Sequence, residues 1–165
     1  MAEVISVNIA EVRTLVRRGQ IVQTGIWKLP ATGSVEVGPL GLEGDRQIDR
    51  RYHGGEDKAL YAYAREDIDW WEAQLGRPLE NGIFGENLTL RGVDVTAAAS
   101  GDRWAVGAAI LAATDPRVPC WKLGERIGDP AFVKRFGEAS RPGIYLRVIK
   151  PGSVAAGAVV EPLAR

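Results

Sequence analysis

The sequence contains few of the residues that usually build metal or disulfide sites. Its 165 residues include one cysteine, one histidine and one methionine. A single cysteine cannot form a disulfide within the chain, and a structural zinc site needs four cysteine or histidine ligands. An iron–sulfur cluster likewise needs several cysteines. The sequence therefore excludes an internal disulfide, a structural zinc site and an iron–sulfur cluster ligated by this chain alone.

Long apolar runs and an excess of charge are also absent. No apolar run reaches the 18 residues expected of a membrane-spanning helix, and residues 1–6 do not resemble the start of a signal peptide. Lysine plus arginine and aspartate plus glutamate each total 21, so no overall field attracts nucleic acid or an anionic membrane. We therefore expect no nucleic-acid or membrane partner, and the single cysteine is typical of a cytoplasmic protein.

The composition that remains is that of an ordinary globular domain. Hydrophobic residues make up 45% and charged residues 25% of the chain, and 165 residues fit one domain spanning 1–165. The 20 glycines and 9 prolines predict many turns and short strands. Strand patterns occur at residues 4–8, 33–39, 58–63, 87–90, 103–106, 109–114, 144–149 and 159–163.

Two helices are expected among these strands. Ile68, Trp71 and Leu75 share one helical face and predict a helix over residues 66–75, ended by Gly76. A second helix is predicted over residues 130–136, with Asp129 as its N-cap. Residues 11–24 give no clear pattern, and 40–55 is expected to be a loop. Because strands and helices do not alternate, we predict a mainly β fold, a closed or nearly closed β-barrel with a few short peripheral helices.

Cys120 is the first candidate for chemistry. It lies between two cations, Arg117 and Lys122, in a segment stiffened by Pro116 and Pro119. A thiol with cationic neighbours is easier to ionise, and the thiolate is both a nucleophile and a metal ligand. A lone cysteine is otherwise often a buried apolar residue. A rigid loop after a strand favours a functional role.

A glycine-rich basic segment at residues 41–58 is the second candidate. Glycines let the backbone approach a ligand closely, and arginine and lysine side chains bind phosphate. A solvated charged loop is the alternative, with the histidine in a structural role. The candidate ligand-binding residues of this segment are Gly44, Asp45, Arg46, His53, Gly54, Gly55 and Lys58.

Two further segments carry polar residues at strand ends. Asn87 and Thr89 are alternate residues of a predicted strand and are expected to share one face. There they could recognise a heteroaromatic ring by hydrogen bonds. Arg141 precedes another strand and could add to an anion site. In each case the alternative is an ordinary strand end.

Taken together, six blocks of sequence form an ordered set that covers nearly the whole chain. They are Gly-Leu-Glu-Gly-Asp-Arg-Gln (41–47), His-Gly-Gly-x-Asp-Lys-Ala (53–59), Gly-x-Phe-Gly-Glu-Asn-Leu-Thr (82–89), Gly-Asp-Arg-Trp (101–104), Pro-Arg-x-Pro-Cys-Trp-Lys-Leu (116–123) and Arg-Pro-Gly-x-Tyr-x-Arg-Val (141–148). In this order they resemble the MOSC domain, the family of the C-terminal domain of molybdenum-cofactor sulfurases.

The resemblance implies a β-barrel that binds a molybdenum cofactor, a molybdenum-pyranopterin. It implies that Cys120 ligates molybdenum and that the Gly-Asp-Arg and His-Gly-Gly blocks line the cofactor pocket. It further implies the reduction of N-hydroxylated compounds, including N-hydroxylated nucleobases. The family is also associated with pyridoxal phosphate binding. The remaining predicted cofactor-binding residues are Lys58, Asn87, Thr89, Arg117 and Arg141.

Two alternatives stay open. In the first, Cys120 carries a persulfide, received from a cysteine desulfurase, to a metal centre. In the second, the protein stores the cofactor without turnover. A reductase of this kind needs a separate electron-donor protein, because the sequence has no flavin or iron–sulfur motif. The protein is expected to be a monomer or a homodimer.

Overall fold

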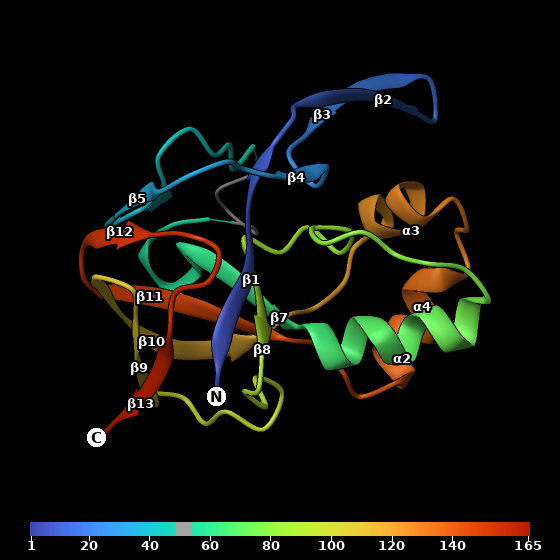
Figure 1. Cartoon of the computed structure of the whole chain (residues 1–165). Helices are drawn as coiled ribbons and strands as arrows, with labels where there is room; N and C mark the ends of the chain where they lie inside the picture. The colour runs from blue at the N-terminus through green and yellow to red at the C-terminus, as the bar shows by residue number, and fades with distance from the viewer. Residues whose placement is uncertain (49–53) are drawn as a thin grey trace.

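An eight-stranded sheet is the main layer of the structure (Figure 1), a computed structural model that describes residues 1–48 and 54–165. All neighbouring strands are antiparallel except the pair β7 and β8. In spatial order the strands are β13 (Val160–Leu163), β9 (Arg103–Val106), β10 (Ala109–Pro116), β11 (Ile144–Lys150), β7 (Leu60–Ala64), β8 (Leu88–Arg91), β1 (Glu3–Ala10) and β4 (Lys28–Pro30).

Two smaller sheets flank the main one. The first contains β12 (Gly152–Val154), β5 (Val35–Gly38) and β6 (Gly41–Leu42). The second is a separate hairpin of β2 (Arg13–Arg17) and β3 (Gln20–Thr24), which projects at the top of Figure 1. On this hairpin Val16 and Ile21 lie opposite each other and are 72% and 77% exposed. The unclear pattern of residues 11–24 therefore reflects a ribbon with apolar residues on its solvent side.

The helices gather on one side of the sheet (Figure 1). They are α2 (Arg65–Leu75), α3 (Trp121–Ile127) and α4 (Phe132–Glu138), and a 3₁₀ turn, η1 (Glu56–Lys58), precedes β7. An aromatic cluster that includes Trp71, Phe132 and Phe136 fills the space between these helices and β7. Within the described parts of the chain, no helix is long and apolar enough to cross a membrane.

The predicted helix at residues 66–75 is confirmed as α2, one residue longer at its start. Its buried residues include Ile68 and Trp71, as the spacing requires, and Gly76 ends it with φ 68°. The second helix is displaced. Asp129 accepts a hydrogen bond from the Ala131 N–H at 2.9 Å, and α4 begins only at Phe132, so Pro130 precedes the helix and Gly137 lies inside it.

The expected barrel is not confirmed. The fold is mainly β, and among the described residues the paired strands form an open series rather than a ring. The first residues of β1 nevertheless pair with the segment that precedes β13. An isolated bridge joins Glu3 to Val159, and the Val4 N–H donates to the Ala158 oxygen at 2.8 Å. The sheet is therefore curled, with an apolar core that includes Val4, Leu90 and Leu111.

Several short elements were absent from the predictions. These are α3 and the strands β2, β3, β4, β6 and β12. All of the strands that were predicted are present, and each of their ends lies within two residues of the predicted end. The predicted tight connection at Gly107-Ala108 joins β9 to β10, with Val106 opposite Ala109. Of the missed strands, β4, β6 and β12 have only two or three residues, too few to show a periodic pattern, whereas β2 and β3 have five each.

A buried carboxylate organises the turn that leads into β8. The side chain of Glu86 is fully buried and accepts hydrogen bonds from the N–H groups of Gly82 at 2.6 Å and Phe84 at 3.0 Å and from the Thr89 hydroxyl at 3.0 Å. Burial raises the pKa of Glu86, and these donors oppose that shift. The side-chain amide of Asn8 then joins β1 to the same turn by donating to the Glu86 backbone oxygen at 3.1 Å.

We expect Glu86→Gln to lower the free energy of unfolding by about 2 kcal/mol, because an amide NH₂ would face a backbone N–H that needs an acceptor. Chemical denaturation measures this change. The matched control is Glu80→Gln, whose side chain is 57% exposed beside Arg126 and should change stability by less than about 1 kcal/mol. Equal small changes in both variants would contradict a structural role for the buried carboxylate.

Candidate functional site

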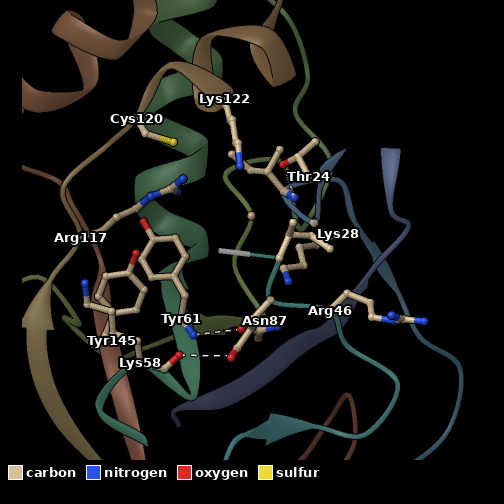
Figure 2. A pocket seen from close by; sticks show the side chains of 15 residues that line it. Thr24, Lys28, Arg46, Lys58, Tyr61, Asn87, Arg117, Cys120, Lys122 and Tyr145 are labelled. Carbon is tan, nitrogen blue, oxygen red and sulfur yellow. Dashed lines mark hydrogen bonds between the residues drawn. The ribbon is translucent and has the colours of Figure 1, made fainter. Parts of the chain in front are cut away.

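One cavity collects most of the chemistry-bearing side chains (Figure 2). Its empty volume is about 610 Å³, including the part open to solvent. It lies between the end of β3, the start of β4, the turn before β8, β7, β11 and the segment that leads into α3. The described residues that line it are Thr24, Gly25, Ile26, Lys28, Arg46, Gln47, Ile48, Lys58, Tyr61, Gly85, Asn87, Arg117, Cys120, Lys122 and Tyr145.

The cavity is strongly cationic. Its described lining includes no aspartate or glutamate but five basic residues, Lys28, Arg46, Lys58, Arg117 and Lys122. Because the whole chain has equal numbers of acidic and basic residues, this is a local concentration of positive charge. A concave site lined by one sign of charge attracts ligands of the opposite sign. The cavity therefore suits an anionic ligand.

A buried ion pair lies at the inner end of the cavity. The Lys28 ammonium is 2.7 and 2.9 Å from the two oxygens of Asp45, and their side chains are 8% and 3% exposed. Burial lowers the pKa of Lys28, and the Asp45 carboxylate opposes that shift. Asp45 also accepts hydrogen bonds from the Ala10 N–H and the Asn87 side-chain amide, both at 2.8 Å. Its oxygens are thus occupied inside the protein.

Asn87 is similarly engaged. Besides its bond to Asp45, its side-chain oxygen accepts a hydrogen bond from the Tyr61 N–H at 3.0 Å (Figure 2). Its amide also donates to the Asn8 backbone oxygen at 3.3 Å. The residue therefore joins β7 to β1 across the turn before β8. Asn87 lines the cavity, but its side chain mainly holds protein segments together. We call Lys28, Asp45 and Asn87 the floor of the cavity.

The opposite wall carries Cys120 and Arg117. Cys120 is partly exposed and immediately precedes α3. Arg117 is only 6% exposed, donates to the Phe84 backbone oxygen and stacks on the Tyr61 ring, with 4.8 Å between the guanidinium carbon and the ring centroid. Arg117 interacts electrostatically with Cys120, and Lys122 lines the same cavity (Figure 2). Both cations that flank the cysteine in sequence therefore line the same cavity as its thiol.

The structure brings together five of the predicted site residues. Arg46, Lys58, Asn87, Arg117 and Cys120 line the cavity, although Arg46 extends away from Cys120 in Figure 2. The prediction for His53 lies outside the described residues. The predicted residues absent from the lining are Gly44, Asp45, Gly54, Gly55, Thr89 and Arg141.

Besides Asp45, two of these absent residues have other partners. The Thr89 hydroxyl bonds to Glu86 and Asn8, so it is held inside the fold and does not share a cavity face with Asn87. Arg141 pairs with Asp67 and covers the Trp70 ring at 4.4 Å, in a hollow on another side of β7. Sequence position alone does not reveal these partners, because Asp67 precedes Arg141 by 74 residues.

Four important lining residues were not among the predicted ligands: Lys28, Lys122, Tyr61 and Tyr145. The signal for Lys122 was present, because it follows Cys120 by two residues. The tyrosines carried a weaker signal, since alternation along a strand does not show which face meets a cavity. Nothing local marked Lys28.

The described residues do not preform a metal site. Among the described residues there is no group of three or more histidine, cysteine, aspartate or glutamate side chains able to hold a metal ion. A metal in the cavity would therefore have to arrive with most of its ligands. Cys120 is the soft ligand that the cavity offers.

Comparisons with known proteins agree with this picture. A model of the MOSC domain matches residues 49–161. The chain is 38% identical over 162 residues to YflK of Bacillus subtilis and 32% identical over 145 residues to YiiM of Escherichia coli, and covers 73% and 65% of their lengths. It is 29% identical over 153 residues to a protein of Gibberella moniliformis named "Reductase" but spans only 27% of it.

The fold agrees as well. The crystal structure of YiiM from Geobacillus stearothermophilus matches all of this chain with a TM-score of 0.81 and 32% identity. The match covers 76% of that protein. The chain is thus shorter than each of these relatives.

We expect Asp45→Asn to lower the free energy of unfolding by about 3–5 kcal/mol, because it leaves the buried Lys28 ammonium without its counter-charge. Chemical denaturation measures the loss. The double variant Asp45→Leu with Lys28→Met removes both charges and should recover part of it. Glu138→Gln, which disrupts an exposed pair with Lys134, is the control and should change stability by less than about 1 kcal/mol. A loss for Asp45→Asn no larger than for this control would contradict the role of the pair.

Proposed function

This chain belongs to the MOSC domain family, and we propose that its cationic cavity binds a molybdenum cofactor with Cys120 as the protein ligand to molybdenum. The observation that carries the proposal is the donor set. One partly exposed thiol lies among basic side chains, with no carboxylate in the described lining and no second soft ligand.

The residues present fit such a group. A molybdenum cofactor is anionic and brings a dithiolene and oxo ligands with its metal, so it requires one soft thiolate from the protein. Arg117 and Lys122 line the cavity together with Cys120 and provide positive charge. The floor of Lys28, Asp45 and Asn87 is held by internal hydrogen bonds, so the cavity keeps its shape while the cations of the wall remain available.

The proposed reaction is the reduction of N-hydroxylated compounds, including N-hydroxylated nucleobases, to amines. Conversion of R–NHOH to R–NH₂ consumes two electrons and two protons and releases water. When bound, the cofactor would supply the two-electron chemistry. The chain's own residues would bind and orient: Cys120 holds the metal, and the neighbouring cations balance the charge of the ligands.

The electrons would come from a separate donor protein, because a single cysteine cannot hold an iron–sulfur cluster. This chain matches 27% of the Gibberella moniliformis protein named "Reductase". That name agrees with a reductive reaction, and the electron source is proposed to be a partner.

A sulfur carrier is the second candidate function, because Cys120 is partly exposed in a cavity and has no second cysteine with which to form an internal disulfide. Its thiolate would attack the persulfide of a cysteine desulfurase, take the outer sulfur and release the desulfurase thiolate. The two functions make opposite demands on the sulfur atom of Cys120. As a metal ligand it is occupied, whereas as a carrier it must remain free.

We expect the chain, purified from a host that makes the cofactor, to contain molybdenum, and Cys120→Ala to contain at least about tenfold less. Elemental mass spectrometry gives the metal content, and fluorescence of the oxidised pterin gives the organic part independently. Lys134→Ala is the control, since that side chain is 83% exposed on α4. Equal molybdenum in wild type and Cys120→Ala, both folded by circular dichroism, would refute the ligation proposal.

The molybdenum-loaded chain should also resist persulfide formation at Cys120. Incubation with cysteine and a cysteine desulfurase, followed by mass spectrometry of the intact protein, detects an added sulfur as about 32 Da. No adduct is expected on the loaded protein. A stable adduct on Cys120 of a protein that never acquires molybdenum would favour the carrier function instead.

A further inference from the structure

Three tyrosines on the adjacent strands β7 and β11 differ in how their hydroxyls are used. The Tyr61 hydroxyl donates to the Pro142 backbone oxygen at 2.6 Å, and the Tyr63 hydroxyl donates to the Arg141 backbone oxygen at 2.7 Å. For Tyr145 no hydroxyl hydrogen bond to any described residue is found, although its ring is 5.4 Å from that of Tyr61. Tyr145 is thus the one whose donor is not used within the described fold.

This hydroxyl belongs to a residue that lines the cavity. Tyr145 is only 7% exposed, and a buried phenol normally has a hydrogen-bond partner. Tyr145 also lines the cavity, and Figure 2 shows its ring directed toward Arg117, on the side where Cys120 lies. The Tyr145 backbone oxygen accepts a hydrogen bond from the Thr114 hydroxyl at 3.1 Å, which ties β11 to β10 at this residue. The hydroxyl is not among the buried polar atoms that lack a partner, so it reaches the cavity and is available to donate to a ligand there.

The electrostatic surroundings keep this group a donor. Burial raises the pKa of the Tyr145 hydroxyl, Arg117 opposes that shift, and Cys120 adds to it. The Lys58 ammonium lies 5.2 Å from the centroid of the ring. A raised pKa means that the phenol stays protonated at neutral pH. A neutral O–H donor beside cations and a thiol matches a ligand that presents an oxygen acceptor.

We propose that Tyr145 contacts the substrate and donates a hydrogen bond to the oxygen of its N–O group. The proposal rests on the proposed function, since the reacting oxygen must approach the space next to Cys120, which the Tyr145 side chain faces. The hydrogen bond positions the oxygen and stabilises the charge that grows on it as the N–O bond breaks. No proton is taken from Tyr145 in this role, and its hydroxyl is unchanged after the reaction.

The first test is kinetic. Tyr145→Phe in the molybdenum-loaded protein, with an artificial reductant and benzohydroxamic acid as substrate, should lower kcat/KM by about 10- to 100-fold, as expected for loss of a hydrogen bond to a charged or charging group. The matched control is Tyr63→Phe, which removes the same hydroxyl from the neighbouring strand outside the cavity. It should reduce thermal stability, because Trp71 also donates to that hydroxyl at 3.1 Å, and leave kcat/KM within about twofold.

The second test needs no turnover. With 3-fluorotyrosine incorporated, the four tyrosines give separate fluorine NMR signals, and the Tyr145 signal is the one that disappears in Tyr145→Phe. Without a reductant, benzohydroxamic acid should shift this signal. Benzamide, the same molecule without the N–O oxygen, should not. If Tyr145→Phe does not fold, phenylalanine variants of the other three tyrosines assign the signal by elimination.

The outcomes separate the two proposals. If the wild type reduces the hydroxamic acid but Tyr145→Phe is equally active and the signal does not move, the role of Tyr145 is refuted and the proposed function stands. If the hydroxamic acid and benzamide shift the signal equally, contact with the N–O oxygen is also refuted. If the loaded wild type reduces no N-hydroxylated compound, the proposed function fails, and the fluorine signal still decides whether Tyr145 meets the oxygen.

Discussion

The ion pair between Lys28 and Asp45 is the interaction on which the cavity depends. Two charges that are almost completely buried are stabilising only if their remaining hydrogen-bonding groups are also satisfied. Here Asp45 gains two further donors, the Ala10 N–H and the Asn87 amide. With Lys28, the three partners of Asp45 come from β1 (Ala10), β4 (Lys28) and the turn before β8 (Asn87). Satisfying one carboxylate therefore fixes three segments that are distant in sequence, and the floor of the cavity follows from their positions.

This arrangement separates two kinds of polar residue in one cavity. On the floor, Asp45 and Asn87 direct their side-chain groups to protein partners, so a ligand would have to compete with bonds already made. On the opposite wall, Cys120 and Tyr145 have polar atoms without hydrogen-bond partners among the described residues. A ligand therefore gains most by binding to that wall, and the floor contributes shape and positive charge. Burial alone does not distinguish these roles, because Asn87 and Tyr145 are 3% and 7% exposed.

The sequence predicted those features that depend on local pattern. Helix α2 was predictable because Ile68 and Trp71 repeat at helical spacing and Gly76 supplies the left-handed end. Helix α3 was not, since its seven residues carry too little pattern and follow a proline. The site shows the same limit. The local sequence around Asp45 is the same whether this residue faces a ligand or pairs with Lys28. Likewise, nothing in the sequence around Arg141 indicates that it pairs with Asp67. The thiol wall was predictable because Arg117, Cys120 and Lys122 are neighbours in sequence.

The two sides of the cavity are nevertheless in direct contact. Cys120, Arg117 and Tyr145 fall within the segment that the family model matches, whereas the lining residues from Thr24 to Ile48 precede it. At Gly85 a Cβ atom would lie 2.9 Å from the Ile26 side chain, closer than packed atoms tolerate. Ile26 is two residues before Lys28, so a side chain at Gly85 would press on the segment that carries the floor lysine. The turn before β8 therefore packs closely on the segment before β4, and the shape of the cavity depends on residues from both parts of the chain.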